Sequence, residues 1–199
     1  EYHDCVEECS GGMSVEEAAA FALEKERAFG QVLFIFNTRA AARKVYELLQ
    51  GKTQGRLFHL STWMCAENRS DRLKEIRQAL AGREKVICIS TQLVEAGVDV
   101  SFRCVVRSLA GLDNLVQAAG RCNRNGEATP GHVFLDRMAE TAESLSSLPD
   151  IRKAQEAMQN FLCSFRKNPE EYGGRMDSEN AIRDYYRFYF HDRQEEMKY

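Results

Sequence analysis

The sequence predicts an α/β fold, in which an open parallel sheet is flanked by helices. Its short apolar runs have the length of strands, and the run 31–36 (Gln-Val-Leu-Phe-Ile-Phe) is continuous, which is typical of a strand covered on both faces. Segments with apolar residues at helical spacing alternate with these runs. Such alternation predicts a parallel sheet with right-handed crossover connections. With 13 glycines and 3 prolines among 199 residues, the chain is not of a disordered or collagen-like type.

The expected elements follow one another along the chain. A first helix is expected after Ser14, because Ser14 and Glu17 have the spacing of a capping box and an alanine-rich segment follows. The N-terminal segment around His3 and Asp4 is expected to be irregular. Strands are expected at 31–36, 56–60, 86–90, 104–107 and 132–136. Helices are expected between them, at 39–50, near 68–81 and at 113–119.

The last third of the sequence is predicted to be helical. One helix starts at Pro149 and ends at 168–169, and a second, capped by Asp177 or Ser178, ends in an aromatic cluster at 185–190. These two helices are interpreted as an appendage whose partner lies partly outside the chain. The predicted domain organisation is a connecting segment with a helix (1–30), an α/β domain (31–137) and a helical appendage (138–199).

Charge and composition exclude several classes of protein. The chain carries 27 basic and 30 acidic residues, so any contact with nucleic acid must come from local geometry and not from a general basic field. No apolar run approaches the about 20 residues of a membrane helix, so we expect a soluble protein with no membrane partner. Seven cysteines are an odd number, and Cys88 and Cys104 lie in predicted strands, which favours a reducing, cytoplasmic location. Glu1 is not a methionine and no signal sequence follows it, so we interpret the chain as a piece of a longer protein.

The segment 90–99 (Ser-Thr-Gln-Leu-Val-Glu-Ala-Gly-Val-Asp) carries groups that suit a phosphorylated ligand. A strand delivers Ser90 and Thr91 to the carboxyl edge of the sheet, where hydroxyl groups can hold a phosphate and where we expect the chemistry of the protein. Gly97 permits a close approach of the backbone, and Asp99 can accept a hydrogen bond from a ribose hydroxyl. By itself, the Gly-Val-Asp pattern also describes a turn after a helix.

A second informative segment contains Gln117, Arg121 and Arg124, whose spacings of four and three would place them on one face of a helix. Two guanidinium groups that project together can stabilise the charge on a transferring phosphoryl group. By themselves, such arginines are more often solvated or paired with surface carboxylates. The two segments in this order, after alternating strand–helix units, form a more specific signal than either one.

Together the two segments resemble motifs V and VI of superfamily 2 helicases. The longer strings STQLVEAGVDV, LAGLDNLVQAAGRCNRNGE and FNTRAAARKVYELL are similar to the helicase part of the CRISPR-associated type I helicase-nuclease family, over about residues 31–136. The string HLSTWMC resembles the type I-C branch of that family. The resemblance implies that 31–137 is a second RecA-like domain, which is half of an ATP-driven motor that pulls single-stranded DNA. It also implies that the C-terminal helices begin the linker that follows this domain.

The resemblance carries nucleic-acid roles over to five residues. Asn37, Thr38 and Arg39 match motif IV, which approaches the phosphates of the bound strand in this superfamily. Thr91, in motif V, would touch the nucleic-acid backbone too, and Ser90 beside it is assigned to the same site.

Five further residues receive nucleotide roles from the resemblance. Gly97 and Asp99 would approach the nucleotide and its ribose. Arg121 and Arg124 would be arginine fingers that reach ATP bound on the neighbouring domain, and Gln117 would couple the two sides. ATP and Mg²⁺ would be bound mainly by the first RecA-like domain, which this sequence does not contain.

Several parts of such a motor are missing from this sequence. The triplet 51–53 (Gly-Lys-Thr) follows a helix, and Tyr46 stands where a Walker A loop needs its first glycine. No acidic motif for Mg²⁺ and no nuclease centre is recognisable. We therefore expect the chain alone to be inactive and to hold no cofactor or metal. Its expected partners are the first RecA-like and nuclease domains of the same protein, single-stranded DNA and a CRISPR RNA-guided surveillance complex.

A zinc site at the N-terminus is a weaker candidate. Cys5 and Cys9 could ligate Zn²⁺ together with His3 or His59. No second cysteine pair has the spacing of a zinc site, so free thiols are the simpler interpretation.

Two other features have structural explanations that compete with a functional one. Cys122 lies between the two arginines, whose charge would lower the pKa of its thiol, yet no activating base is evident. The aromatic cluster 185–190 could stack nucleic-acid bases, although aromatic residues at helical spacing more often belong to a core.

Two alternative functions stay open. The chain could belong to another superfamily 2 motor, such as a repair or RNA helicase, which a test with DNA and RNA substrates would distinguish. It could also be an ATP-independent binding or scaffold module that has a RecA-like shape. The paired arginines argue against a scaffold, because a scaffold does not need two guanidinium groups directed at the nucleotide of a partner.

Overall fold

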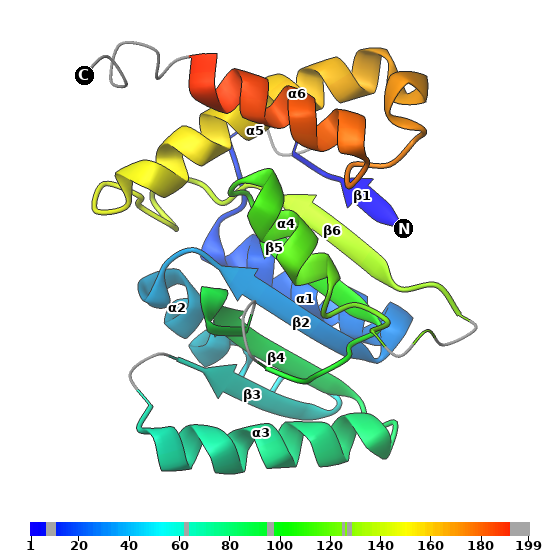
Figure 1. Cartoon of the computed structure of the whole chain (residues 1–199). Helices are drawn as coiled ribbons and strands as arrows, with labels where there is room; N and C mark the ends of the chain where they lie inside the picture. Colours follow the sequence, from blue (N-terminus) through cyan, green and yellow to red (C-terminus); the bar gives the residue numbers. More distant parts are fainter. Residues whose placement is uncertain (7–10, 62–63, 95–97, 125, 127–128, 192–199) are drawn as a thin grey trace.

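The structure, a computed structural model, describes residues 1–6, 11–61, 64–94, 98–124, 126 and 129–191. In these residues six strands form one sheet, in which all neighbouring pairs are parallel and the order is β1-β6-β5-β2-β4-β3 (Figure 1). The strands are β1 (Tyr2–Asp4), β2 (Gln31–Phe36), β3 (Arg56–Leu60), β4 (Val86–Thr91), β5 (Cys104–Ser108) and β6 (His132–Asp136). The helices are α1 (Val15–Phe29), α2 (Arg39–Leu49), α3 (Ala66–Ala81), α4 (Leu112–Ala119), α5 (Pro149–Lys167) and α6 (Glu179–His191). The expected α/β fold with a parallel sheet flanked by helices is confirmed.

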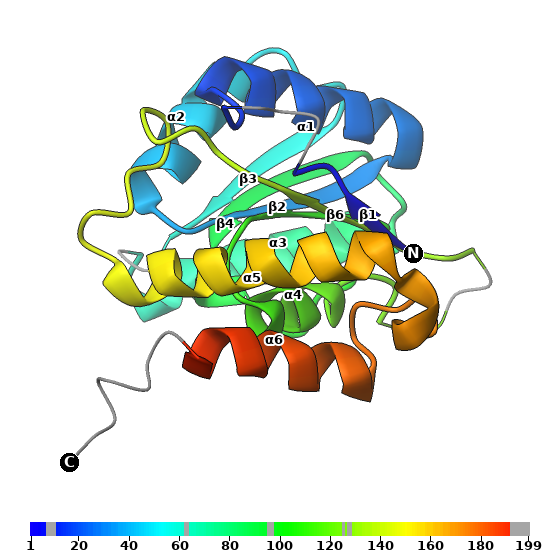
Figure 2. The same cartoon turned by 90° about the horizontal axis from the view of Figure 1, so that it is seen from above.

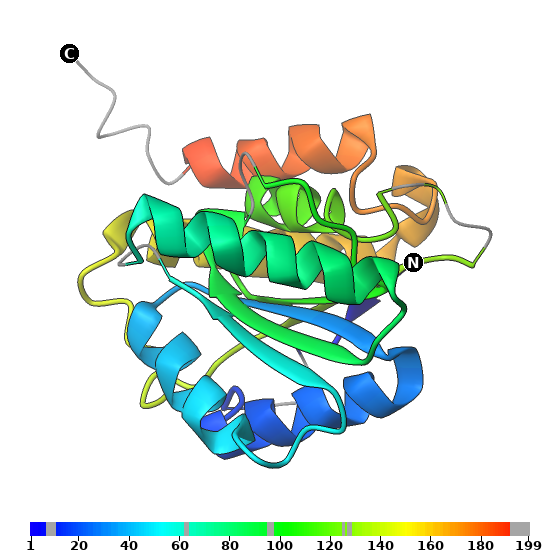
Figure 3. The same cartoon turned by 90° about the horizontal axis from the view of Figure 1, so that it is seen from below.

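Helices cover both faces of the sheet. α1 and α2 lie on one face, whereas α3, α4 and α5 lie on the other (Figure 2 and Figure 3). Strand β2 is buried along its whole length because its side chains alternate between two cores. Phe34 packs into the core under α1 and α2, and Leu33 and Ile35 pack into the core under α3. The two-sided cover explains why 31–36 is a continuous apolar run.

The first helix begins at the capping box that the sequence predicts. The Ser14 hydroxyl accepts a hydrogen bond from the Glu17 amide at 3.1 Å, and the Glu17 carboxylate accepts one from the Ser14 amide at 2.8 Å. The helix ends at Gly30, whose φ of 78° is accessible to glycine at little cost. α1 therefore has a local start signal and a local stop signal.

The prediction of an irregular N-terminus is wrong, because Tyr2–Asp4 forms the edge strand β1. This strand pairs in parallel with β6, with Tyr2 beside Val133 and Asp4 beside Leu135. Three residues of mixed polarity show no apolar period, so the strand depends on its pairing with β6, which lies about 130 positions later in the chain.

Of the two C-terminal helices, α5 packs directly on the sheet. Met158, Phe161 and Leu162 of α5 share a core with Val133 and Leu135 of β6. α6 packs on the outside of this layer, against α5 (Figure 1). The division of the chain into 1–30, 31–137 and 138–199 stays a prediction, although all three parts pack around one sheet.

The aromatic cluster on α6 divides between core and surface. Tyr185 is 1 % exposed and belongs to the core, as the structural explanation predicts. Ile182, Tyr186 and Phe190, which are four residues apart, are 40 %, 38 % and 44 % exposed, and the first two line a hollow together with residues of α4. Among the described helices, none combines the length and the apolar composition that crossing a bilayer requires.

The triplet 51–53 lies in a turn after α2. Gly51 has a φ of 72°, and the Lys52 amide donates to the Leu49 carbonyl at 3.1 Å, so the chain turns here before it enters β3. A Walker A loop instead connects a strand to the start of a helix. The triplet is therefore a helix-terminating turn, as expected.

Candidate functional site

A groove opens at the carboxyl edge of the sheet, where β2 and β4 end side by side. It has a volume of about 530 Å³. Thr38, Arg39 and Lys44 line it from the start of α2, and Thr91 lines it from the end of β4. The opposite wall, which the sequence did not indicate, comes from the loop after β6 and includes Thr141, Ser144 and Ser147. The groove thus brings together three segments, near Thr38, Thr91 and Thr141, and each is about 50 residues from the next along the chain.

The chemistry of this groove suits phosphate groups. Arg39 and Lys44 are exposed cations, and threonine and serine hydroxyls can donate hydrogen bonds to phosphate oxygens. The Thr38 hydroxyl also caps α2, because it accepts a hydrogen bond from the Ala41 amide at 3.2 Å. The structure therefore brings Thr38, Arg39 and Thr91 together, as a shared nucleic-acid site requires.

Asn37 has a different environment from the one expected. Its side chain is almost fully buried, and its Nδ2 donates to the Leu109 carbonyl and to the Glu143 carboxylate, at 2.9 Å each. Its Oδ1 accepts a hydrogen bond from Arg107 at 2.8 Å. The polar atoms of Asn37 thus bind other parts of the fold, so a phosphate contact by this side chain is not favoured by the structure.

Ser90 is also directed into the fold. It is 0 % exposed, and its hydroxyl donates toward the carbonyls of Leu60 at 3.3 Å and Thr91 at 3.1 Å. The reason is the alternation of side chains along β4, which turns Ser90 toward the interior. Of the two hydroxyls expected in motif V, only that of Thr91 lines the groove.

A buried carboxylate, Glu143, organises the end of β2. Its Oε1 accepts from the amides of Asn37 at 2.7 Å and Thr38 at 3.0 Å, and its Oε2 accepts from the Ser108 hydroxyl at 2.5 Å. The amides lie at the N-terminus of α2, where backbone N–H groups lack helical partners and favour a negative charge. Arg107, which is 0 % exposed, balances this charge through Asn37.

The sequence did not predict a role for either charged residue of this network, Arg107 or Glu143. The available signal was Arg107 within the apolar run 104–108, because a charge in a strand covered on both faces needs a buried partner. The structure gives Arg107 the Asn37 amide oxygen as a hydrogen-bond partner, and nothing local to Glu143 indicated that it binds the same Asn37 side chain.

The helix that carries Gln117 ends at Ala119, before the two arginines. The expectation that Gln117, Arg121 and Arg124 share one helical face is therefore wrong for the arginines. The physical reason is a competing pairing, in which the Phe102 amide donates to the Arg121 carbonyl and the Asn123 amide donates to the Phe102 carbonyl, at 2.9 Å each. This pairing replaces further turns of α4.

The two arginines nevertheless lie close enough to interact electrostatically. Arg121 donates from Nε to the Val94 carbonyl at 3.0 Å, and the Arg124 guanidinium pairs with the Asp99 carboxylate at 3.1 Å. Burial lowers the pKa of Arg121, and the positive charge of Arg124 lowers it further, whereas Asp99 opposes this shift. Two cations that repel each other favour an added anion, so the pair suits a phosphate.

This arginine pair lies beside the start of β5, because its segment pairs with Phe102 just ahead of that strand. The arginine pair therefore does not lie at the carboxyl edge of the sheet, where all of the chemistry was expected. Only the groove lies at that edge.

The other predicted nucleotide residues have separate environments. Gln117 is exposed on α4, Asp99 is paired with Arg124, and Gly97 lies outside the described residues.

Cys122 has the properties of a packed thiol. Burial raises its pKa to about 11, and its Sγ lies 3.4 Å from the His132 carbonyl. A reactive cysteine needs a lowered pKa. The packing explanation is therefore favoured over a catalytic one.

The zinc candidate at the N-terminus is not supported by the topology. His3 lies on β1 and His59 on β3, which are the two opposite edges of the sheet, so they cannot share one ion. Cys9 lies outside the described residues. His3 is close instead to His132 of β6 and to Glu1, neither of which was considered as a metal ligand from the sequence.

Comparisons with known proteins agree with this architecture. Residues 28–127 match the family model described as CRISPR-associated nuclease/helicase Cas3, C-terminal. A CRISPR-associated nuclease/helicase Cas3 of Haloferax volcanii is 55 % identical over 74 residues, which are 36 % of this chain and 8 % of that protein. The aligned segment thus covers about a twelfth of the length of this relative. No branch of the family is distinguished, so the type I-C assignment stays a prediction.

Solved structures show the same fold at low sequence identity. A crystal structure of T. fusca Cas3 superposes with a TM-score of 0.67 at 20 % identity, over 83 % of this chain and 22 % of that chain. The C-terminal domain of the DEAD-box protein Dbp5 superposes with a TM-score of 0.53 at 16 % identity, over 71 % of this chain and 77 % of that domain. The fold is therefore that of a RecA-like helicase C-terminal domain. Because the family model covers half of the sequence, this chain belongs to the C-terminal family of the CRISPR-associated nuclease/helicase Cas3.

Proposed function

We propose that this chain is the second motor domain of an ATP-dependent translocase that moves on single-stranded DNA in CRISPR interference. The observation that carries the proposal is the arginine pair, in which Arg121 and Arg124 are close enough to repel each other and Arg124 is 45 % exposed next to Asp99. Paired guanidinium groups at a surface suit a triphosphate held by a second domain. The groove beside Thr91 supplies a separate hold on a nucleic-acid backbone.

The residues present fit one side of a nucleotide. Arg121 and Arg124 would contact the phosphates, and Asp99 would exchange its bond to Arg124 for one to the ribose. The turn at 51–53 offers no phosphate cradle, so the remaining contacts and Mg²⁺ belong to a first RecA-like domain. Bound ATP supplies the phosphoryl group whose hydrolysis drives the motor. The chain contributes cations that neutralise charge on that group, and Gln117 couples this site to the rest of the domain.

The groove would hold DNA without reading its sequence. Thr38, Thr91 and the two cations Arg39 and Lys44 suit phosphate oxygens, which are the same for every base. Opening and closing between the two RecA-like domains would shift this hold along the strand. Target choice would then come from partners, namely the nuclease domain of the same protein and an RNA-guided surveillance complex.

We expect the 199-residue chain alone to hydrolyse no ATP above background, because it has no Walker A loop. Phosphate release during incubation with ATP and single-stranded DNA is the measurement. Turnover that co-elutes with the purified chain would contradict the two-domain proposal. Stimulation of the full-length protein by RNA and not by DNA would favour an RNA helicase, and nucleotide-independent DNA binding without any hydrolysis would favour a scaffold.

Replacing Lys44 with alanine in the full-length protein is expected to weaken single-stranded DNA binding roughly fivefold at 0.1 M salt, because one phosphate contact is lost. The slope of log K against log salt concentration should decrease by about 0.7. Fluorescence anisotropy over a salt series measures both quantities. The matched control is Lys74→Ala on α3, where the ammonium pairs with Asp71 at 3.3 Å outside the groove. Equal slopes for the wild type and the Lys44 variant would remove Lys44 from the DNA site.

A further inference from the structure

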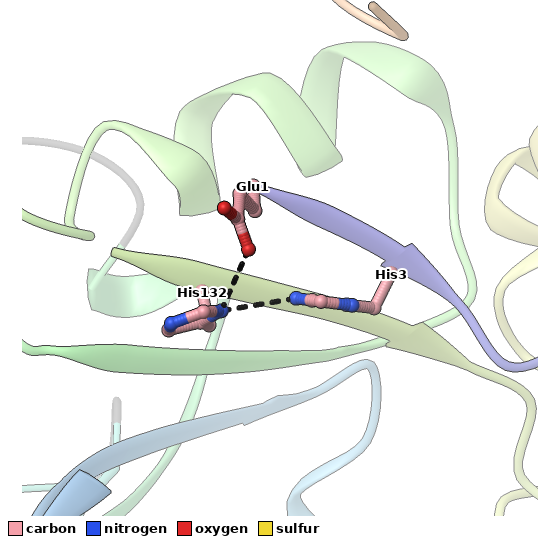
Figure 4. A group of neighbouring side chains, drawn as sticks. All are labelled: Glu1, His3 and His132. Atoms are coloured by element: carbon pink, nitrogen blue, oxygen red, sulfur yellow. Dashed lines mark hydrogen bonds and ion pairs between the residues drawn. The ribbon is translucent and has the colours of Figure 1, made fainter. Parts of the chain in front are cut away.

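Three metal-ligating side chains converge at the β1 edge of the sheet (Figure 4). Glu1 and His3 are two positions apart on one extended segment, so both face the same side. The Val133 amide donates to the Glu1 carbonyl at 2.8 Å, and this pairing sets Glu1 beside His132 at the start of β6. The three side chains point toward one another from two neighbouring strands (Figure 4).

The distances between the ligand atoms suit one small ion. His3 Nε2 lies 3.0 Å from His132 Nδ1, and Glu1 Oε2 lies 3.4 Å from the same Nδ1. All three ligand atoms lie within 4.8 Å of one another. In a tetrahedral site with metal–ligand bonds of about 2.0–2.1 Å, neighbouring ligand atoms are separated by roughly 3.3 Å. The cluster therefore needs only small shifts to enclose an ion.

The donor set selects the kind of ion. Two imidazoles with one carboxylate suit Zn²⁺ and similar transition-metal dications, whereas Mg²⁺ and Ca²⁺ prefer sets of oxygen ligands. Three protein ligands leave a fourth position for water.

Aromatic neighbours hold both imidazoles in place. The His3 ring stacks on Phe134 at 4.4 Å between centroids, and the His132 ring lies 4.5 Å from that of Phe29. Rings that are already held lose little conformational freedom when they bind an ion. The Lys25 ammonium, 4.2 Å above the Phe134 ring, opposes a cation here, and the Glu24 carboxylate, 2.9 Å from that ammonium, offsets its charge.

We propose that Glu1, His3 and His132 form a binding site for a transition-metal dication, with Zn²⁺ as the reference ion. The ion would join the three-residue edge strand β1 to β6. The site is independent of the proposed motor function, because neither the groove nor the arginine pair contributes a ligand.

The test titrates Zn²⁺ into the metal-free 199-residue chain, made with an acetylated N-terminus so that the terminal amine cannot act as a ligand. Calorimetry should show one ion bound per chain, and His3→Gln and His132→Gln should each weaken binding at least tenfold. The matched control is His59→Gln, since His59 stacks on Tyr46 at the opposite edge of the sheet and should leave the affinity unchanged. Mg²⁺ should not bind at this site.

A spectroscopic measurement separates this site from metal bound by cysteines. Co²⁺ in the wild-type chain should give the visible absorption of a tetrahedral or five-coordinate site, without the charge-transfer bands of thiolate ligands. The proposal is overturned if the wild type binds no Zn²⁺ at micromolar concentrations, if the double His3→Gln/His132→Gln variant binds as well as the wild type, or if thiolate bands dominate. The Co²⁺ spectrum of the wild type decides the matter even if a variant fails to fold.

Discussion

ATP hydrolysis by the full-length protein is expected to fall about 10³- to 10⁵-fold when Arg124 is replaced by alanine, which is the usual effect of removing an arginine finger. In the structure this side chain is half-exposed and pairs only with the exposed carboxylate of Asp99 among the described interactions. Its removal should therefore leave the fold intact, with a change in unfolding free energy within about 0.5 kcal/mol. Single-turnover hydrolysis at saturating ATP measures the effect on the chemical step.

Two further variants sharpen this test. Arg124→Lys retains the charge but not the planar fork, so most of the loss should persist. Arg43→Ala removes an exposed arginine of α2 that pairs with Glu47 at 2.8 Å, and hydrolysis should stay at the wild-type rate. Wild-type turnover in Arg124→Ala would exclude Arg124 as a finger, and an equal loss in Arg43→Ala would show that the effect is not specific.

The second large effect concerns stability. Glu143→Ala is expected to lower the free energy of unfolding by about 3–5 kcal/mol, because it removes a buried carboxylate that Asn37 joins to the buried Arg107 guanidinium. It also leaves the amides of Asn37 and Thr38 without their carboxylate acceptor. Urea denaturation of the chain, followed by circular dichroism, measures the loss.

Conservative and distant replacements test the cause of this effect. Glu143→Gln retains one acceptor oxygen and should cost less, about 1–3 kcal/mol. Glu140→Ala, an exposed position in the same loop, should change stability by no more than about 0.5 kcal/mol. In the double variant Arg107→Met/Glu143→Leu, the loss should be smaller than the sum of the two single losses, since both charged groups that bind the Asn37 side chain are then removed together. Strict additivity would contradict a coupled pair.

The Glu143 network also bears on the groove. Its hydrogen bonds fix the backbone at 37–38, from which Thr38 and Arg39 reach the groove. The loop that carries Glu143 supplies the opposite wall through Thr141 and Ser144. The buried Glu143 carboxylate thus links the wall at the start of α2 to the wall formed by the loop after β6.

Most of the fold was predictable because its signals are local. The apolar runs of β2, β4 and β5, the capping box at Ser14 and the terminating turn at Gly51 each depend on a few adjacent residues. Thr91 on the groove could be found in the same way, because it follows a predicted strand end, whereas Thr38 was identified by the resemblance to motif IV.

The sequence by itself determined the alternation of elements and the sheet class, which follow from periods and spacings along the chain, and its motif strings indicated the family by resemblance. Only the tertiary structure decided the pairing of β1 with β6, the turn that separates Arg121 from α4, and the partners of Arg107 and Glu143. These features depend on contacts between residues that are 20 to 130 positions apart. They are stabilised by backbone pairing and by the interactions of buried charges. Neither of these produces a periodic pattern in the local sequence.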